Sequence, residues 1–168
     1  MRSCLITLTL VLSFTFIAHA DEKSLYDAPD RAPSLGEKLK KFFGPKSEAI
    51  NYDARMIRAA EIAMRRAEPK KTWYCWRYVK KALLAAGLVD SYPTSPWAKQ
   101  AGDELCRKYG FQKLNLRDPY KAPVGAVIVY GGQDAGHVEL RSKKGFVSDF
   151  ISRTPYPRPL VGIYVKPS

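Results

Sequence analysis

Residues 72–87 read TWYCWRYVKKALLAAG, and this stretch decides the fold that the sequence predicts. Apolar side chains recur along it three and four residues apart, which is the spacing of one face of an α-helix. Gly87 suits the left-handed residue that commonly ends a helix, and Thr72 suits the N-cap. Cys75 would then lie in the first turn, where unpaired N–H groups and the helix dipole favour a thiolate. The stretch therefore predicts a helix that begins near a nucleophilic cysteine.

A base for that cysteine is available further along the chain. His137 is the only histidine after residue 20, and it follows a nearly continuous apolar run, 125–130, and a glycine-rich turn, 131–136. The run predicts a buried strand, and the turn would place His137 at the start of the next strand. A cysteine–histidine pair also needs a third group that holds the imidazole in its productive tautomer. The alternative is a lone histidine satisfied by local hydrogen bonds.

Two acidic residues compete for the third position. Glu139 lies two residues after His137 on the same strand, about 6.5 to 7 Å along it. Asp149 lies on the following strand. A three-residue connection, 142–144, would place it opposite His137, whereas a two-residue turn would send it to the other face. We predict Asp149, because cross-strand neighbours lie closer than neighbours on one strand, and Glu139 stays the alternative. Either acid could instead be a solvated residue of its strand.

The first twenty residues have the features of a signal peptide. Arg2 precedes a predominantly apolar run of about 14 residues, and residues 18–20, Ala-His-Ala, form a small-x-small cleavage site before Asp21. That run is too short to span a bilayer comfortably. We therefore expect 1–20 to be removed, no transmembrane segment after cleavage, and a mature protein that is periplasmic or secreted.

The net charge of the chain indicates which kinds of binding partner to expect. The chain carries 28 basic and 16 acidic residues, a net charge of +12, or about +11 without Arg2. A strongly basic exported protein suggests an anionic partner such as a cell-wall polymer, although the excess could simply keep the protein soluble. The basic residues are spread along the chain without a recognisable nucleic-acid module, so we expect no nucleic acid partner. One histidine and a few acidic residues spread along the chain do not form a set of zinc ligands, so we expect no bound metal.

The order of the predicted helices and strands along the chain indicates an α+β fold in a single domain. Residues 21–50 carry charge and prolines with little apolar periodicity, and we interpret them as an N-terminal arm or linker. Helices are expected at 52–67, over the Cys75 stretch, and from Ser95-Pro96-Trp97 to Gly110. Strands are expected at 125–130, 137–141, 146–151 and 161–165. Helices that precede strands favour N-terminal helices packed on an antiparallel sheet of about four or more strands, with 51–168 as the catalytic domain.

Several motifs, taken in order, resemble the NlpC and CHAP superfamily of papain-like cysteine peptidases and amidases, which cleave peptidoglycan peptides. The motifs are Cys75-x-x-Tyr78-Val79, the sequence PVGAV at 123–127, Gly136-His137-Val138, and an acid twelve residues after the histidine. The resemblance covers about 52–165 and implies a papain-like NlpC-type fold. It also implies the catalytic residues Cys75, His137 and Asp149. The chain departs from the central NlpC pattern at Tyr74 and at 76–77, which indicates a divergent member.

The resemblance implies an exported hydrolase that cuts an amide bond in peptidoglycan through a thioester intermediate, as a monomer and without a cofactor. The oxyanion would be met by N–H groups at the start of the Cys75 helix. Four aromatic residues are candidates for a groove that stacks on sugar or peptide: Trp73, Tyr74, Trp76 and Trp97. Each of them could equally be part of an ordinary aromatic core.

A disulfide is the main competing hypothesis. Exported proteins are often oxidised, and a Cys75–Cys106 bond would join two helices of a basic secreted binding module with no turnover. The position of Cys75 argues for the enzyme, because a structural disulfide requires neither a helix N-terminus nor a histidine. Cys106, beside Leu105 inside the third helix, fits a small buried hydrophobe.

Overall fold

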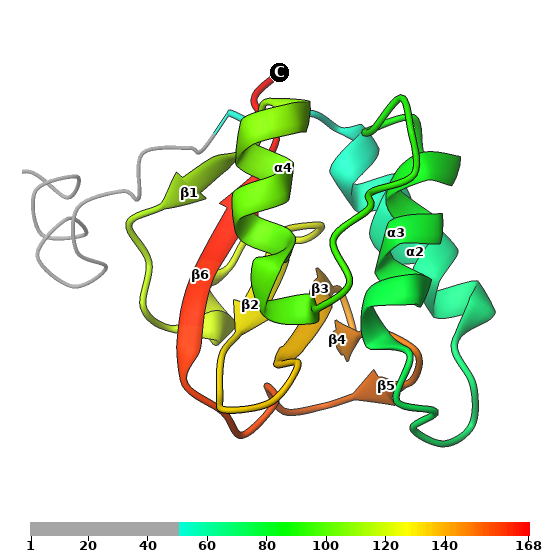
Figure 1. The fold of residues 1–168 in the computed structure, drawn as a ribbon. Helices are drawn as coiled ribbons and strands as arrows, with labels where there is room; N and C mark the ends of the chain where they lie inside the picture. The colour runs from blue at the N-terminus through cyan, green and yellow to red at the C-terminus, as the bar shows by residue number, and fades with distance from the viewer. Residues whose placement is uncertain (1–50) are drawn as a thin grey trace, which may run out of the picture. The chain divides into compact units, whose positions relative to one another are not determined.

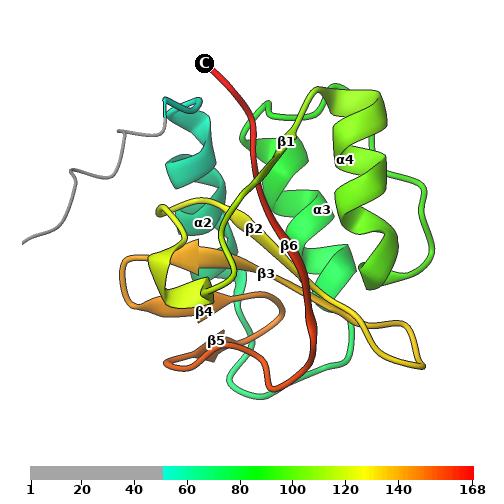
Figure 2. The same cartoon turned by 90° about the vertical axis from the view of Figure 1, so that its left-hand side faces the viewer.

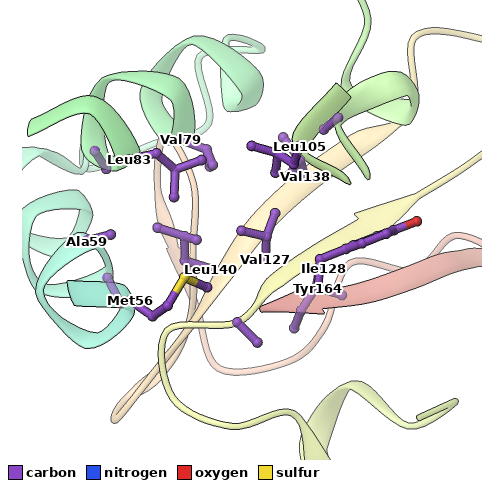
Figure 3. Packing of buried hydrophobic residues seen from close by; sticks show 14 of the residues in the cluster. Met56, Ala59, Val79, Leu83, Leu105, Val127, Ile128, Val138, Leu140 and Tyr164 are labelled. Atoms are coloured by element: carbon purple, nitrogen blue, oxygen red, sulfur yellow. The ribbon is translucent and has the colours of Figure 1, made fainter. Parts of the chain in front are cut away.

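The structure is a computed structural model, and it describes residues 51–168. The first elements of this part of the chain are two amphipathic helices. α2 (Arg55–Arg66) and α3 (Cys75–Ala85) pack against each other and against β3 (Figure 1). Their apolar stripes are the cause: Met56 and Ala59 of α2 and Val79 and Leu83 of α3 are fully buried. The sheet side of this core is lined by Leu140 and its neighbours (Figure 3).

Six antiparallel strands form one sheet, in the order β1-β6-β2-β3-β4-β5. The strands are β1 (Gln112–Leu114), β2 (Val127–Tyr130), β3 (His137–Ser142), β4 (Gly145–Val147), β5 (Ile151–Ser152) and β6 (Leu160–Val165). A short 3₁₀ turn, η2 (Pro119–Lys121), leads into β2. The predicted α+β class is confirmed, and β2 is the completely buried strand that its apolar run predicted. β1 was not predicted.

The third helix packs on the same face of the sheet as the first two. Val127 is paired with Leu140 on one side and with Tyr164 on the other, so these side chains share a face. Tyr164 lies against Gly102 of α4 (Ala101–Tyr109), where a Cβ would overlap its ring. All three described helices therefore cover one side of the sheet, as the rotated view also shows (Figure 2).

The helix ends differ in part from the sequence prediction. Gly87, with φ 72°, and Gly110, with φ 71°, follow α3 and α4 as predicted. The predicted N-cap of α3 at Thr72 is wrong, because the helix begins at Cys75 with Tyr74 as its N-cap. The third helix also begins later than predicted. A 3₁₀ turn, η1 (Ala98–Gln100), with Trp97 as its N-cap, precedes α4.

The connection between β3 and β4 is the two-residue turn. Ser142 is paired with Gly145, and Leu140 with Val147. This register excludes the three-residue connection on which the pairing of Asp149 with His137 was predicted, so that pairing is wrong. The predicted strand at 146–151 is also interrupted, because residues 148–150 separate β4 from β5.

Some predicted segments lie outside the described residues. These are the signal peptide, 1–20, and the arm or linker, 21–50. The described residues, 51–168, belong to one compact unit. Within that part of the chain, no helix combines the length and the apolar character that crossing a bilayer requires.

Candidate active site

Cys75 is the first residue of α3, and its side chain is half-buried in the wall of a cleft. The first N–H groups of an α-helix have no acceptor within the helix. In α3 these groups begin at the cysteine itself, so they are available to negative charge that develops next to its sulfur. The sequence prediction that Cys75 lies in the first turn is confirmed.

His137 lines the same cleft from the start of β3. The preceding residue, Gly136, has φ 75°, and a Cβ there would lie 2.5 Å from the carbonyl oxygen of Tyr130. Only glycine accommodates this turn, which is what presents the imidazole beside Cys75. His137 is 2 % exposed. Burial alone would lower the pKa of His137, but the neighbouring Cys75 thiol and Glu139 carboxylate together raise it above the usual value.

Glu139 is the acid that lies next to the imidazole. Its Oε2 atom is 3.5 Å from Nε2 of His137, and both side chains are 3 % exposed. We expected the distance along the strand to separate Glu139 from His137, but the two methylenes of the glutamate side chain let its carboxylate reach the imidazole. Because Nε2 faces Glu139, Nδ1 is the ring nitrogen available to Cys75. The Glu139 carboxylate therefore lies beside Nε2 of the imidazole, in a ring that lines the same cleft as Cys75.

The other oxygen of Glu139 is fixed by two donors. The Tyr130 hydroxyl donates to Oε1 over 2.7 Å, and the backbone N–H of Tyr156 donates to the same atom over 3.4 Å. Burial, together with the adjacent carboxylate charge, raises the pKa of Tyr130 well beyond its usual range, so its hydroxyl stays a donor. Glu139 is therefore held in position while Oε2 stays directed at His137.

Asp149, which we predicted as the third catalytic residue, has a different set of contacts. It is fully buried, and its carboxylate accepts hydrogen bonds from Thr72 N (2.6 Å), Thr72 Oγ1 (2.9 Å) and Ser148 Oγ (3.0 Å). Burial opposes ionisation, but these hydrogen bonds outweigh it and lower the pKa of Asp149. Among residues 51–168, no hydrogen bond and no ion pair within 4 Å joins it to His137. Asp149 instead anchors the segment that leads into Cys75.

The cleft has a volume of about 270 Å³. Of the four groove candidates, Trp73 (78 % exposed) and Tyr74 (58 % exposed) both line it and are largely exposed. Trp76 also lines it, but it is buried and its Nε1 donates to the backbone oxygen of Ser95 over 3.1 Å. Trp97 is half exposed and is not among the lining residues. Trp73 and Tyr74 therefore remain predicted groove residues that line the cleft, whereas Trp76 belongs mainly to the core.

Tyr156 is a residue of the site that sequence reasoning missed. Its ring stacks on the His137 imidazole, with centroids 3.9 Å apart and an interplanar angle of 21°. Its hydroxyl is hydrogen-bonded to Lys71 Nζ, which also lies 3.8 Å from the ring centroid of Trp73. Tyr156 belongs to the proline-rich segment 154–159, which has no periodicity to reveal an inward-facing residue. An aromatic residue flanked by prolines was the one available signal.

The disulfide hypothesis does not match the structure. Cys75 and Cys106 are both free thiols. Burial, reinforced by the charge of Asp103, raises the pKa of Cys106. Within residues 51–168 no three histidine, cysteine, aspartate or glutamate side chains are grouped as metal ligands.

No family model and no curated protein matches the chain. Two solved structures do, and both are crystal structures of the type VI effector–immunity complex Tae3–Tai3 from Ralstonia pickettii. The native complex matches with 26 % identity and a TM-score of 0.55, over 67 % of this chain and 98 % of the matched chain. The selenomethionine form matches with 26 % identity and a TM-score of 0.52, over 64 % and 98 %. The match accords with the predicted papain-like fold.

Proposed function

We propose that this protein is an exported cysteine amidase or peptidase that hydrolyses an amide bond in peptidoglycan. The observation that carries the proposal is that Cys75 and His137 line one cleft, with the thiol at a helix N-terminus and Glu139 beside Nε2 of the imidazole. The likeness to the Tae3 effector supports a cell-wall hydrolase in general terms. The signal-like residues 1–20 support export.

The first half of the reaction is acyl transfer to sulfur. His137 takes the thiol proton of Cys75 at Nδ1, and the sulfur attacks the carbonyl carbon of the scissile amide. The new C–S bond forms while the carbonyl π electrons move to oxygen. N–H groups at the start of α3 donate hydrogen bonds to this oxyanion. The charge on Glu139 stabilises the imidazolium that exists at this stage.

The second half releases the products. The oxyanion collapses, the C–N bond breaks, and His137 returns the proton to the leaving amine, which leaves a thioester on Cys75. His137 next takes a proton from water, and the hydroxide attacks the thioester carbonyl. Collapse of this intermediate breaks the C–S bond, and the thiolate recovers the proton. The protein's own residues supply every proton transfer.

Asp149 has a supporting role in this mechanism. It holds Thr72 through a backbone and a side-chain hydrogen bond. Trp73, the next residue, has φ 71°, which is an unfavourable left-handed conformation for a bulky side chain. The hydrogen bonds between Thr72 and Asp149 help to hold the backbone in this conformation, which positions Tyr74 and Cys75.

Cleavage products test the proposal directly. Purified sacculi are digested with wild-type protein and with Cys75→Ala, and the released muropeptides are identified by mass spectrometry. We expect new termini at one amide bond with wild type and a loss of at least about 10⁴-fold with Cys75→Ala. Cys106→Ala is the matched control, because it removes a thiol remote from His137, and it should retain activity. Cleavage that survives Cys75→Ala would contradict the cysteine mechanism, and binding without cleavage would favour a binding module.

A further inference from the structure

A buried lysine forms part of the cleft wall. Lys80 lies on α3, five residues after Cys75, and it lines the same cleft. It is only 7 % exposed. Lysine is almost never buried this far unless it is paired, because removing an ammonium from water is costly. Yet no carboxylate of residues 51–168 lies within 4 Å of it.

The protein satisfies Lys80 only in part. Its Nζ donates one hydrogen bond, to the backbone oxygen of Ser95 over 2.7 Å. An ammonium has three N–H donors, so the contacts within the described chain use one of them. Nζ also lies 4.9 Å from the ring centroid of Trp76 and 5.3 Å from that of Tyr92. These aromatic faces hold the cation in place without supplying a counter-charge.

Glu104 is the acid that acts on Lys80 through space, but its oxygens are already engaged. They accept hydrogen bonds from the N–H groups of Thr94 and Ser95, over 2.7 and 2.9 Å, and from Lys108 over 3.2 Å. Burial lowers the pKa of Lys80, and the charge of Glu104 offsets this only in part. The Ser95 oxygen also has a second donor, Trp76 Nε1. A structural link to Ser95 therefore does not require a lysine.

We propose that Lys80 binds a carboxylate of an acidic peptide substrate, an inference that rests on the proposed amidase function. Five helical residues rise about 7.5 Å, and a helical side chain leans toward the N-terminus. The ammonium therefore lies on the Cys75 side of its own Cα, next to the Trp76 ring and in the cleft that Cys75 also lines. A carboxylate there would use the free N–H donors of Lys80 and supply its missing counter-charge.

The other charges of the cleft favour the same ligand. Three further basic side chains line it, Lys71, Arg77 and Arg158, against one acid, Asp134. Arg158 is paired with Asp134. The remaining positive field attracts an anionic peptide into the cleft, and the buried Lys80 selects where its carboxylate is placed.

The test compares free and amidated carboxylates. The substrates are a synthetic peptidoglycan tetrapeptide and variants in which each free carboxylate in turn is amidated. Wild type should prefer the free form at one position by about 10- to 100-fold in kcat/KM, as a hydrogen bond between charged groups implies. Lys80→Met should lose that preference, because its kcat/KM should fall by more on the peptide with the free carboxylate than on the peptide amidated there. Lys81→Met removes an exposed charge from the same helix and should keep the preference.

Stability separates binding from structure. Lys80→Met removes an incompletely paired buried cation, so we expect a Tm equal to or above that of wild type. Lys80→Gln serves as a second variant with the same expected kinetics. A lowered Tm together with equal losses on both peptides would assign Lys80 to the fold and overturn the proposal. A preference that persists in both Lys80 variants would overturn it as well.

A binding measurement distinguishes this inference from the function on which it rests. Calorimetric titration of the inactive Cys75→Ala chain with the free and amidated peptides requires no turnover. If wild type cuts none of the peptides, the proposed function fails. Tighter binding of the free form that disappears in Cys75→Ala/Lys80→Met would still support the carboxylate site. Equal affinity for both peptide forms would overturn the carboxylate site, whatever the enzyme cuts.

Discussion

Glu139 and Asp149 are two buried carboxylates with different partners, one beside His137 and the other beside the segment that leads into Cys75. Oε1 of Glu139 accepts from Tyr130 and Tyr156, while Oε2 faces His137 at 3.5 Å. Both oxygens of Asp149 are engaged by neutral donors, from Thr72 and Ser148. One carboxylate therefore retains an oxygen directed at the imidazole, and the other retains none.

The difference shows what separates a positioning carboxylate from a structural one. Nearness to the histidine in sequence or in register is not sufficient, because a carboxylate whose oxygens are occupied cannot also orient an imidazole. At 3.5 Å the His137–Glu139 contact is longer than a good hydrogen bond. It acts mainly through charge, which matters most when the imidazole is protonated. Asp149 contributes instead by holding the residues before Cys75.

The largest effect expected from this comparison is on turnover by Glu139→Gln. Glutamine keeps the shape and can still accept from Tyr130, but it loses the charge that stabilises the imidazolium. We expect kcat on muropeptides to fall by about 10²- to 10⁴-fold, with a Tm close to that of wild type in mild alkali. Glu61→Gln, which changes an exposed acid on α2, is the matched control and should have no effect. An active Glu139→Gln beside an inactive Asp149→Asn would reverse the assignment.

Asp149→Asn should affect stability more than chemistry. The amide can keep the contacts with Thr72, but it loses their charge-assisted strength, so we expect a loss of about 1–2 kcal/mol in the free energy of unfolding. Turnover should fall by about tenfold or less, because the start of α3 is held less firmly. Chemical denaturation and muropeptide turnover measure the two effects. A loss in turnover as large as that of Glu139→Gln would contradict the division of roles.

The effect of Asp149→Asn on the free energy of unfolding should depend on pH. The pKa of Asp149 is lower in the folded protein than its ordinary value of 3.8. Its charge therefore stabilises the fold above that value, and the stabilisation is lost as the pH falls through the folded-state pKa. The difference in stability between wild type and Asp149→Asn should accordingly shrink below about pH 4. A difference that stays constant into acid would mean that the charge of Asp149 contributes nothing.

Much of the fold followed from sequence because local patterns and tertiary packing agree. The spacing of apolar residues around Val79 and Leu83 predicted α3, and the run 125–130 predicted β2. Cys75 and His137 could be proposed as site residues because each lies at the end of a predicted element, beside a turn or cap signal, and the structure places both in the wall of one cleft. Such end positions are where side chains from different elements meet.

The remaining site residues depend on geometry that the sequence leaves open. The stretch 142–145 is compatible with turns of two or three residues, and one residue of register moves Asp149 to the other face. Tyr156 lies outside the helices and strands, and its ring stacks on the imidazole of a residue 19 positions earlier in the chain. The burial of Lys80 depends on Trp76 and on the Ser95 segment, and in the helical pattern it resembles any exposed lysine. These contacts are long-range, so no local pattern encodes them.

The smallest expected effect, and the most direct comparison of the two acids, is the titration of His137. Burial lowers its pKa, whereas the Cys75 side chain and the Glu139 carboxylate raise it by more. Among residues 51–168, no hydrogen bond or ion pair joins Asp149 to the imidazole. Glu139→Gln should therefore lower the pKa of His137, and Asp149→Asn should leave it unchanged. NMR titration of the imidazole resonances measures both, with a His137→Ala spectrum to separate His19 where the leader is present.

Linkage gives this titration a second readout. A pKa raised above 6.5 in the folded state stabilises the protein fully below 6.5, and the stabilisation is lost as the pH rises through the folded-state pKa. The stability difference between wild type and Glu139→Gln should therefore be larger in mild acid than in mild alkali. If Asp149→Asn shifts the pKa of the imidazole and Glu139→Gln does not, the charge that acts on His137 is that of Asp149. The contacts of Asp149 with Thr72 would then have to open when His137 is protonated.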